Sequence, residues 1–287
     1  MPVDTLSDNC SPQRAATRTE LVSQEKVSNL VDVLLGTMGT SLAEVPSLLK
    51  MASHPLRWAL MTKLAGGDCR VRELAAAADE PQNLVSYHLR LLRSARFIDA
   101  RRSDFDGRDT YYSLNLTRCA GAFGEAASAL HPGLNVSSPV RPAARSVLFL
   151  CTGNSSRSPM AEALLRKNGQ GRIRAASAGS HPKPHIHPTA VQVMRDMYGI
   201  RLDESRTRPW EAVSGRRFDH VITLCDKVRE FADEHGLTTT AHWSIRDPSV
   251  AGGGKRGIYE EFRSVADELN RRIEFLLPVL NASPRDR

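Results

Sequence analysis

The chain has 287 residues, enough for two ordinary domains, with a net charge of +7 and a pI near 9.4. Hydrophobic residues at 41% and charged residues at 25% are typical of a soluble globular protein, and the absence of a long apolar run excludes a membrane-spanning class. The five cysteines show no paired short spacing, so we expect neither a disulfide framework nor a zinc knuckle. The polar N-terminus predicts no secretory signal, and a reducing cytoplasm is the expected compartment. The positive charge suits anionic partners or substrates.

Two changes of composition divide the chain. Residues 1–27 are polar with few large apolar side chains, which predicts a disordered tail. Residues 131–144 hold three prolines and a glycine among serines, which predicts a linker. We therefore expect one domain at 28–130 and a second at 145–287, each burying its own core.

The first domain begins with apolar residues at helical spacing. Such stripes run through 42–49 and 56–64, and the glycine pair 66–67 should end the second helix. A short helix is expected over 71–77. After a turn, Pro81 is at a plausible first position of the next helix.

The helix after Pro81 is amphipathic, with a hydrogen-bonding outer face. Val85, Leu89 and Leu92 should point inward. The outer face carries Gln82, Asn83, Ser86, Tyr87 and Arg90. Such a face can read base edges, although an ordinary helix with a solvated polar face is the alternative.

A β-hairpin should follow this helix. The segments 97–102 and 110–114 bracket an Asp-Gly turn. The hairpin carries the basic residues Arg101, Arg102 and Arg108. Helix, turn, helix and wing, in this order, predict an α+β winged helix-turn-helix domain that places one helix in the major groove of DNA and the wing on phosphates.

The run Val-Ser-Tyr-His-Leu-Arg-Leu-Leu at 85–92, with Arg-Asp-Thr-Tyr-Tyr in the hairpin, resembles the ArsR family of winged-helix repressors over about residues 41–130. The resemblance implies a homodimer, formed through this domain, that binds operator DNA and releases it when a metal or metalloid binds. The family's arsenic sensors often carry a Cys-x-Cys pair where this chain has Arg70 and Arg72. Cys69 stands alone beside them, so we assign no metal site. Cys10 and Cys119 could join it only if the fold or a dimer brings them together, and single buried thiols are the favoured interpretation.

The second domain alternates strands and helices. Strands are expected at 146–150, 173–177, 219–224 and 242–243, and helices at 158–168, 188–198, after 226 and at 257–280. This alternation predicts an α/β domain with a parallel sheet covered on both faces.

A loop between the first strand and helix of this domain holds a thiol and a guanidinium, Cys151 and Arg157. On such a loop the backbone N–H groups and the helix N-terminus can surround a tetrahedral anion and lower the pKa of the thiol. The other residues expected to bind the oxyanion are Thr152, Gly153, Asn154, Ser155, Ser156 and Ser158. A core cysteine beside a loop arginine is the alternative.

Four motifs carry a second resemblance: 151–163, Ser-Ala-Gly at 177–179, Thr-Leu-Cys at 223–225 and Arg-Asp-Pro at 246–248. Together they resemble the low-molecular-weight tyrosine phosphatase fold over about residues 145–280, and more narrowly its thiol-dependent arsenate reductases.

The resemblance implies a role for each motif residue. Cys151 would be the nucleophile, Arg157 would hold the oxyanion and Asp247 would be the general acid. Asn154 would shape the loop, and Ser158 would hydrogen-bond the nucleophilic sulfur.

Two positions favour the reductases over the phosphatases. Phosphatases of this fold usually place tyrosines directly after Asp-Pro, whereas residues 249–254 contain none. Reductases carry a cysteine where this chain has Cys225, which could attack the Cys151 sulfur and release arsenite. A small buried residue at the end of a strand is the alternative reading of Cys225.

The electron source is a further prediction. The thioredoxin-coupled reductases carry a third cysteine where this chain has Ala232. With no cofactor expected in the protein, an external thiol must supply electrons. Either a Cys151–Cys225 disulfide is reduced directly, for example by thioredoxin, or a low-molecular-weight thiol attacks the Cys151 adduct and a glutaredoxin-like protein restores the enzyme.

The sequence thus predicts an ArsR-type regulator fused to an arsenate reductase. Two alternatives remain: a tyrosine or small-ester phosphatase fused to the repressor, and a non-catalytic oxyanion sensor that controls DNA binding. His181, His185 and His187 have spacing that could bind a metal, although a solvated loop is the favoured interpretation.

Overall fold

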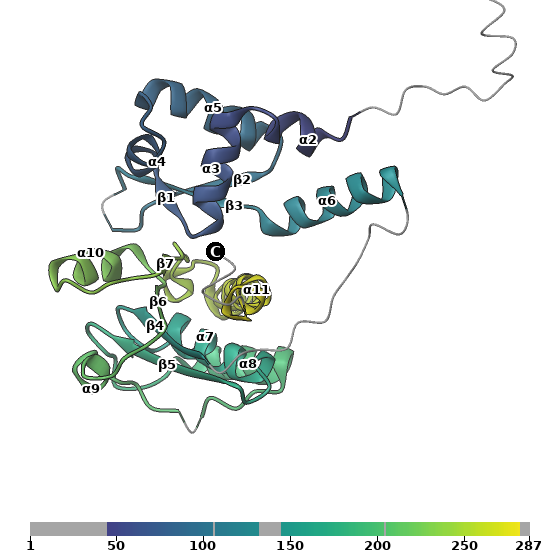
Figure 1. The fold of residues 1–287 in the computed structure, drawn as a ribbon. Coiled ribbons are helices and arrows are strands. Elements are labelled where there is room, and N and C mark those ends of the chain that lie inside the picture. Colours follow the sequence, from purple (N-terminus) through teal and green to yellow (C-terminus); the bar gives the residue numbers. More distant parts are fainter. Residues whose placement is uncertain (1–44, 106, 132–144, 204, 282–287) are drawn as a thin grey trace, which may run out of the picture. The chain divides into compact units, whose positions relative to one another are not determined.

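The computed structural model describes residues 45–105, 107–131, 145–203 and 205–281 (Figure 1). The predicted tail and nearly all of the predicted linker lie outside these residues, so the domain boundaries stay predictions. None of the described helices is long and apolar enough to cross a membrane.

The N-terminal part has the predicted winged-helix arrangement (Figure 1). Its helices are α2 (Ser47–Ala52), α3 (Pro55–Ala65), α4 (Val71–Ala78), α5 (Gln82–Ser94) and α6 (Leu116–Leu130), and its strands are β1 (Cys69–Arg70), β2 (Ile98–Arg102) and β3 (Thr110–Leu114). The strands form an antiparallel sheet in the order β1-β3-β2. The third strand, β1, was not predicted, because two residues are too short to show a periodic pattern.

Helix α5 begins one residue later than predicted. Pro81 is its N-cap, with an extended ψ of 138°, and the helix starts at Gln82. The inward positions are confirmed: Val85, Leu89 and Leu92 are at most 1% exposed and lie in the core of this part. Packing therefore fixes which face of α5 remains outside.

The C-terminal part contains the second set of elements. They are β4 (Arg145–Cys151), α7 (Arg157–Asn168), β5 (Ile173–Gly179), α8 (Pro188–Tyr198), α9 (Glu211–Ser214), β6 (His220–Thr223), α10 (Asp226–Glu234), β7 (Ala241–His242), the 3₁₀ turn η2 (Pro248–Val250) and α11 (Gly254–Asn281). All four strands are parallel, in the order β5-β4-β6-β7. The predicted α/β fold with a parallel sheet is confirmed. Helix α11 begins three residues before the expected start at 257.

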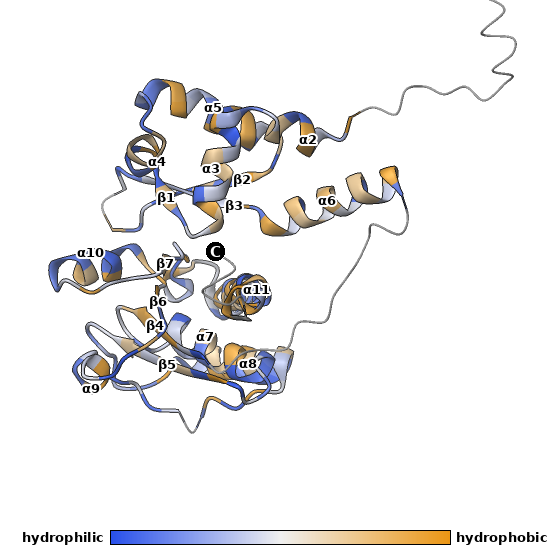
Figure 2. Cartoon of the chain, viewed as in Figure 1, coloured by the Kyte–Doolittle hydropathy of each residue, from blue (hydrophilic) through white to orange (hydrophobic). Residues whose placement is uncertain are grey.

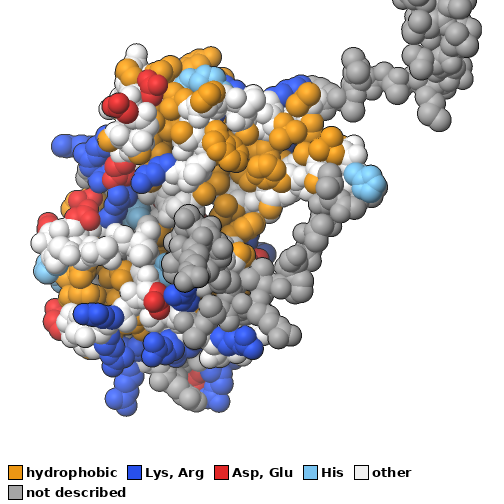
Figure 3. All heavy atoms as spheres, viewed as in Figure 1, with side chains coloured by type: hydrophobic (Ala, Val, Ile, Leu, Met, Phe, Trp, Pro, Cys, Tyr) orange, Lys and Arg blue, Asp and Glu red, His pale blue; other side chains and the backbone are white. Residues whose placement is uncertain are grey.

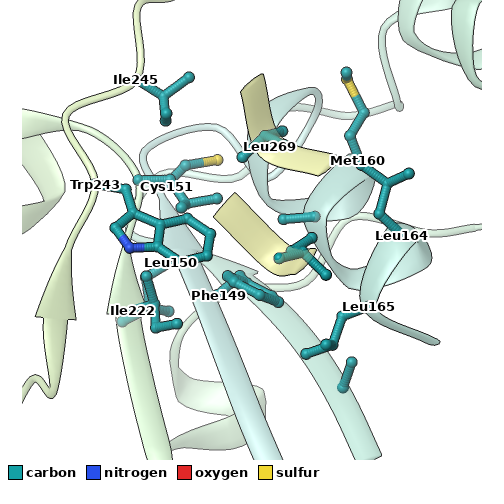
Figure 4. Packing of buried hydrophobic residues seen from close by; sticks show 14 of the residues in the cluster. Phe149, Leu150, Cys151, Met160, Leu164, Leu165, Ile222, Trp243, Ile245 and Leu269 are labelled. Carbon is teal, nitrogen blue, oxygen red and sulfur yellow. The ribbon is translucent and has the colours of Figure 1, made fainter. Parts of the chain in front are cut away.

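The central strand β4 is buried on both faces. Four successive residues, Val147 to Leu150, are at most 1% exposed, and successive side chains of a strand point to opposite faces. Figure 4 shows Phe149 and Leu150 packed among Leu164, Leu165 and Trp243.

The strand register brings three motifs to one edge of the sheet. Cys151 at the end of β4 pairs with Gly179 at the end of β5, and Leu150 pairs with Thr223 at the end of β6. The residues that follow these strands, including Cys225, therefore meet at the carboxyl edge, where open α/β sheets bind their ligands.

Candidate active site

The loop from Cys151 to Ser158 is fixed by a neighbouring loop through three backbone hydrogen bonds. The N–H groups of His181, Lys183 and His187 donate to the carbonyls of residues 152, 153 and 155 at 2.8, 2.9 and 2.8 Å. A carbonyl and the following N–H point in opposite directions across a trans peptide, and the described residues contain no cis bond. The N–H groups of the loop are thus turned away from the neighbouring loop and are available to an anion.

Asn154 gives this loop its shape. Its φ of 41° lies in the left-handed region, and its side chain is completely buried. Nδ2 donates to Ser158 Oγ and Ser177 Oγ, both at 2.9 Å, while Oδ1 accepts from Arg208 N at 2.7 Å. These bonds are in accord with the shaping role that the resemblance implies.

The Cys151 thiol ends the central strand and is buried. Its Sγ lies 3.0 Å from Ser158 Oγ. Burial is the largest effect and raises the pKa of the Cys151 thiol above its ordinary value, although Arg157 and the Ser158 hydrogen bonds oppose the rise. The lowered pKa expected from the sequence is therefore not found in the structure, because that expectation left out the burial of the thiol.

Arg157 is the cation of the loop. Its Nη1 donates to Ile245 O at 3.0 Å and its Nη2 to Asp247 Oδ2 at 2.8 Å. Its Nε is buried and has no acceptor among the described residues. A buried donor without a partner is costly, so Nε is suited to an oxygen of a bound oxyanion.

Asp247 lies beside Arg157 and caps η2. Its Oδ1 accepts from Ser249 N at 3.0 Å and Oγ at 2.7 Å. Burial raises the pKa of Asp247, but Arg157 and the Ser249 hydrogen bonds hold it below its ordinary value. Asp247, the predicted general acid, and Arg157, predicted to hold the oxyanion, are therefore in direct contact.

Cys225 brings a second thiol to the loop. It is buried, it caps α10, and its Sγ lies 3.3 Å from Thr152 Oγ1. A charge on Cys225 is near enough to raise the pKa of Cys151. The two cysteines predicted from separate motifs thus border the same loop.

The mouth of the site is basic and carries no aromatic ring after Asp-Pro. Val250 follows Ser249 there and is 78% exposed. The methylenes of Lys183 lie against Gly153 of the loop. The Lys183 ammonium is near enough to Asp247 and to His187 to lower the pKa of both groups.

The three loop histidines do not form a metal site among the described residues. His187 Nδ1 instead accepts from Thr189 N at 3.2 Å and caps α8, and His181 pairs with Ser180 Oγ at 3.1 Å.

Sequence reasoning missed Glu162, Lys183 and Arg208. Glu162 lies one helical turn after Ser158 in α7, and a carboxylate on the buried face of a helix was an available signal. Lys183 and Arg208 had no sequence signal, because each reaches the loop through a contact between segments distant in sequence.

The predicted DNA-reading face lies on the outside of α5. Gln82, Asn83, Tyr87 and Arg90 are exposed, and Ser86 is half-buried. In the wing, Arg101 and Arg102 are successive strand residues and leave the sheet on opposite faces. Arg102 Nη1 donates to Gly107 O at 3.2 Å, at the turn that also carries Arg108. The structure thus places an exposed polar helix and a basic hairpin in one unit.

The places of the sensor cysteines are filled by ion-paired arginines. Arg70 binds Glu73 at 2.9 Å and Asp109 at 3.1 Å, and Arg72 binds Asp109 at 3.1 Å. Within the described residues, Cys69 and Cys119 belong to no metal-ligand cluster. Cys10 lies outside the described residues.

An apolar surface covers α2 and α6. Leu49 is 38% exposed, Phe123 45% and Leu130 77%. Figure 3 shows hydrophobic side chains gathered over these two helices, and α6 is coloured largely hydrophobic in Figure 2.

Comparisons with known proteins match each of the two parts of the chain to a family. Residues 146–285 match the family "Low molecular weight phosphotyrosine protein phosphatase", and residues 54–100 match "Bacterial regulatory protein, arsR family". An arsenate reductase from Bacillus licheniformis is 34% identical over 134 residues, covering 45% of this chain and 93% of that protein. The chain belongs to the low-molecular-weight phosphotyrosine phosphatase family.

Two further proteins of known sequence or structure are similar to this chain. A glutaredoxin arsenate reductase from Synechocystis is 30% identical over 134 residues, covering 46% of this chain and 96% of its own. The solved structure of "An arsenate reductase in oxidized state" is 29% identical, with a TM-score of 0.41, and the match covers 47% of this chain and 98% of that one. An ArsR-type region followed by a phosphatase-family domain is the organisation that the motifs predicted.

Proposed function

We propose that the phosphatase-family domain reduces arsenate to arsenite through a covalent Cys151 adduct. The observation that carries this proposal is the second thiol at the oxyanion loop, Cys225, 3.3 Å from Thr152 Oγ1. A phosphatase needs one thiol there, whereas reduction needs two. The relatives named arsenate reductase support the same assignment.

The first step forms the adduct. Arsenate binds to the loop N–H groups and Arg157 Nε, and Arg157 leaves Asp247. The Cys151 thiolate attacks arsenic, forming an S–As bond, and one oxygen leaves as water with a proton from Asp247.

The second step transfers electrons. The Cys225 thiolate attacks Cys151 Sγ, forming a disulfide and breaking the S–As bond. The electron pair of that bond stays on arsenic, so As(V) becomes As(III) while the two thiols are oxidised. Arsenite leaves and takes its protons from water.

An outside thiol then restores the enzyme. Ala232, buried in α10, stands where a third cysteine would relay the disulfide. The reductant must therefore reach the Cys151–Cys225 pair directly. We assign this role to thioredoxin, or to a low-molecular-weight thiol with a glutaredoxin-like protein.

We also propose that the N-terminal part is an operator-binding repressor that works as a homodimer. The exposed polar face of α5 and the basic wing support DNA binding, and the apolar surface of α2 and α6 supports dimerisation. Phe123→Asp should then lower the mass of the protein in solution by half in light scattering, whereas an unchanged mass would place the dimer contact elsewhere.

The first experiment is the intact mass of the fully reduced chain after arsenate, followed by peptide mapping. A loss of about two daltons, mapped to Cys151 and Cys225, is the expected result. An unchanged mass, together with no arsenite formed when small thiols and a glutaredoxin-like protein are supplied, would overturn the reductase. Rapid aryl phosphate hydrolysis would then favour the phosphatase, and a shift of DNA affinity by phosphate that survives Cys151→Ser would favour the oxyanion sensor.

A further inference from the structure

The segment that carries Cys225 leaves the sheet just before this residue. Strands β6 and β7 pair over two residues each, and their pairing ends at Thr223 and His242. The next backbone bond on the β7 side, from Ile245 N to Leu224 O, is long at 3.3 Å. On this side the backbone bonds therefore weaken as the chain approaches the second thiol.

The side chain of His242 joins the residues on both sides of Cys225. Its Nδ1 lies 2.8 Å from Thr223 Oγ1, two residues before the thiol, and its Nε2 lies 3.2 Å from Asp226 Oδ1, one residue after it. Ser244 Oγ donates to the same carboxylate oxygen at 2.6 Å. These four polar side chains belong to residues that are at most 6% exposed, so water competes little for their bonds.

The carboxylate sets the direction of these bonds. Burial raises the pKa of Asp226, but hydrogen bonds from His242 and Ser244 hold it below its ordinary value. The ionised carboxylate can only accept, so His242 donates from Nε2. Burial lowers the pKa of His242 and favours the neutral ring, whose Nδ1 can then accept from the Thr223 hydroxyl. One neutral ring thus binds both partners, each through a different nitrogen.

The bonds to Thr223 and Asp226 fix the place of the second thiol. Cys225 is the N-cap of α10 and Asp226 is its first residue, so a bond to Asp226 also fixes the start of the helix. A disulfide requires Cβ atoms about 3.5–4.5 Å apart. A displacement of about 1 Å can slow a reaction between two held groups by about a hundredfold. The bonds of His242 therefore bear on how readily Cys225 joins Cys151.

We propose that His242 is a positioning residue for the second thiol: by binding Thr223 and Asp226 it holds Cys225 where its sulfur can join Cys151. His242 acts through its neighbours and takes no part in the changes of covalent bonds. The proposal rests on the proposed function only in taking the two cysteines as the pair that forms a disulfide.

The direct test is the equilibrium between the Cys151–Cys225 disulfide and the two thiols in the full chain. Glutathione disulfide oxidises the pair and becomes two glutathione thiols, so a series of glutathione buffers gives the equilibrium constant by alkylation and peptide mass. His242→Ala should lower this constant by about tenfold, because the two thiols are held close together less often. An unchanged constant in the folded variant would overturn the proposal.

The matched control is His235→Ala. His235 is the C-cap of α10, at the end of the helix away from Cys225, and it is exposed. Its removal should leave the equilibrium constant unchanged. An equal fall in His235→Ala and His242→Ala would contradict a role for the bonds of His242.

Two substitutions of Thr223 separate the hydrogen bond from the packing of the buried ring. Thr223→Val keeps the branched shape but loses the hydroxyl that binds His242, so it should lower the equilibrium constant. Thr223→Ser keeps the hydroxyl and should retain the constant of the unchanged chain. This pair also decides the matter if His242→Ala does not fold. Equal constants for Thr223→Val and Thr223→Ser would overturn the proposal.

Protection of Cys151 from iodoacetamide by phosphate separates positioning from general damage. Thr223→Val should retain this protection, because the bonds of His242 act on the second thiol and leave the oxyanion loop in place. Loss of protection together with the lower constant would show damage to the whole site and would overturn a specific role for His242.

None of these readouts uses arsenate, so the proposal and the reductase can fail separately. A lower constant in Thr223→Val, with no arsenite formed by the unchanged chain, would remove the reductase and leave the positioning role standing. Arsenite formation with equal constants in both Thr223 variants would do the reverse.

Discussion

Arg157 Nη2 donates to Asp247 Oδ2 at 2.8 Å, so the cation expected to hold the oxyanion is already bound to the expected acid. Burial raises the pKa of Asp247, and Arg157 is foremost among the groups that hold it low. A bound oxyanion takes over Arg157 and places negative charge near the carboxylate. Both changes should raise the pKa of Asp247, so we expect the carboxylate to gain its proton when the oxyanion binds.

Asp247→Asn should separate binding from chemistry. In the variant the Asp247 carboxylate no longer competes with phosphate for Arg157, and one negative charge at the site is removed. Inorganic phosphate should therefore bind about tenfold more tightly. Adduct formation should slow by about a hundredfold or more, because the leaving oxygen has no acid. Protection of Cys151 from iodoacetamide by phosphate measures the first effect, and single-turnover arsenate reaction measures the second. Weaker phosphate binding in this variant would contradict the competition.

Cys225→Ser should stop turnover after the first step. Arsenite production should fall to the level of Cys151→Ser, because no thiol beside Thr152 can attack the adduct. Phosphate protection of Cys151 should persist, since the loop itself is unchanged. Cys119→Ala, which removes a thiol from α6, is the control and should retain turnover. Full activity of Cys225→Ser would show that an external thiol attacks the Cys151 adduct.

The sequence predicted the site to the extent that local motifs define it. The Cys151 loop, Asp247 and Cys225 each follow a strand or precede a helix, and parallel strands bring such positions to one edge. Whether two thiols meet at one loop depends on the strand register, which no local pattern contains. The ion pair between Arg157 and Asp247 was missed for the same reason, since it joins segments distant in sequence, whereas strand β1 was missed because its two residues are too few to show a period.

Lys183 should set the electrostatics of the mouth. Lys183→Met removes the ammonium that lies near Asp247, so phosphate binding should weaken by about two- to fivefold, an effect typical of an exposed charge. Lys183→Arg should restore the affinity, and Lys167→Met, at the far end of α7, should leave it unchanged. The phosphate protection assay at low and high salt checks this, because added salt should shrink the difference. Equal losses of phosphate affinity in Lys183→Met and Lys167→Met would refute a specific role for the Lys183 charge.

Gly179 should be required for the shape of the loop. A Cβ there would lie 2.6 Å from Thr152 O and 2.9 Å from Asn154 N, and both are backbone atoms that cannot move without moving the loop. Gly179→Ala should lower the free energy of unfolding by about 1–3 kcal/mol and abolish phosphate protection of Cys151. Gly215→Ala, where nothing lies within 4 Å of the added carbon, is the matched control. Urea denaturation and the protection assay would contradict the argument if both variants behaved alike.

Arg102 in the wing should contribute to DNA affinity without contributing to sequence choice. On a duplex selected by the full chain from a random library, Arg102→Ala should reduce the slope of log affinity against log salt by about one, because one phosphate contact is lost. Asn83→Ala, on the exposed face of α5, should instead reduce the preference for the selected duplex over a random one and leave the slope in place. Arg263→Ala removes an exposed charge from α11 and should change neither quantity. Fluorescence anisotropy over a salt series checks all three, and an unchanged slope in Arg102→Ala would remove the wing from the DNA-binding surface.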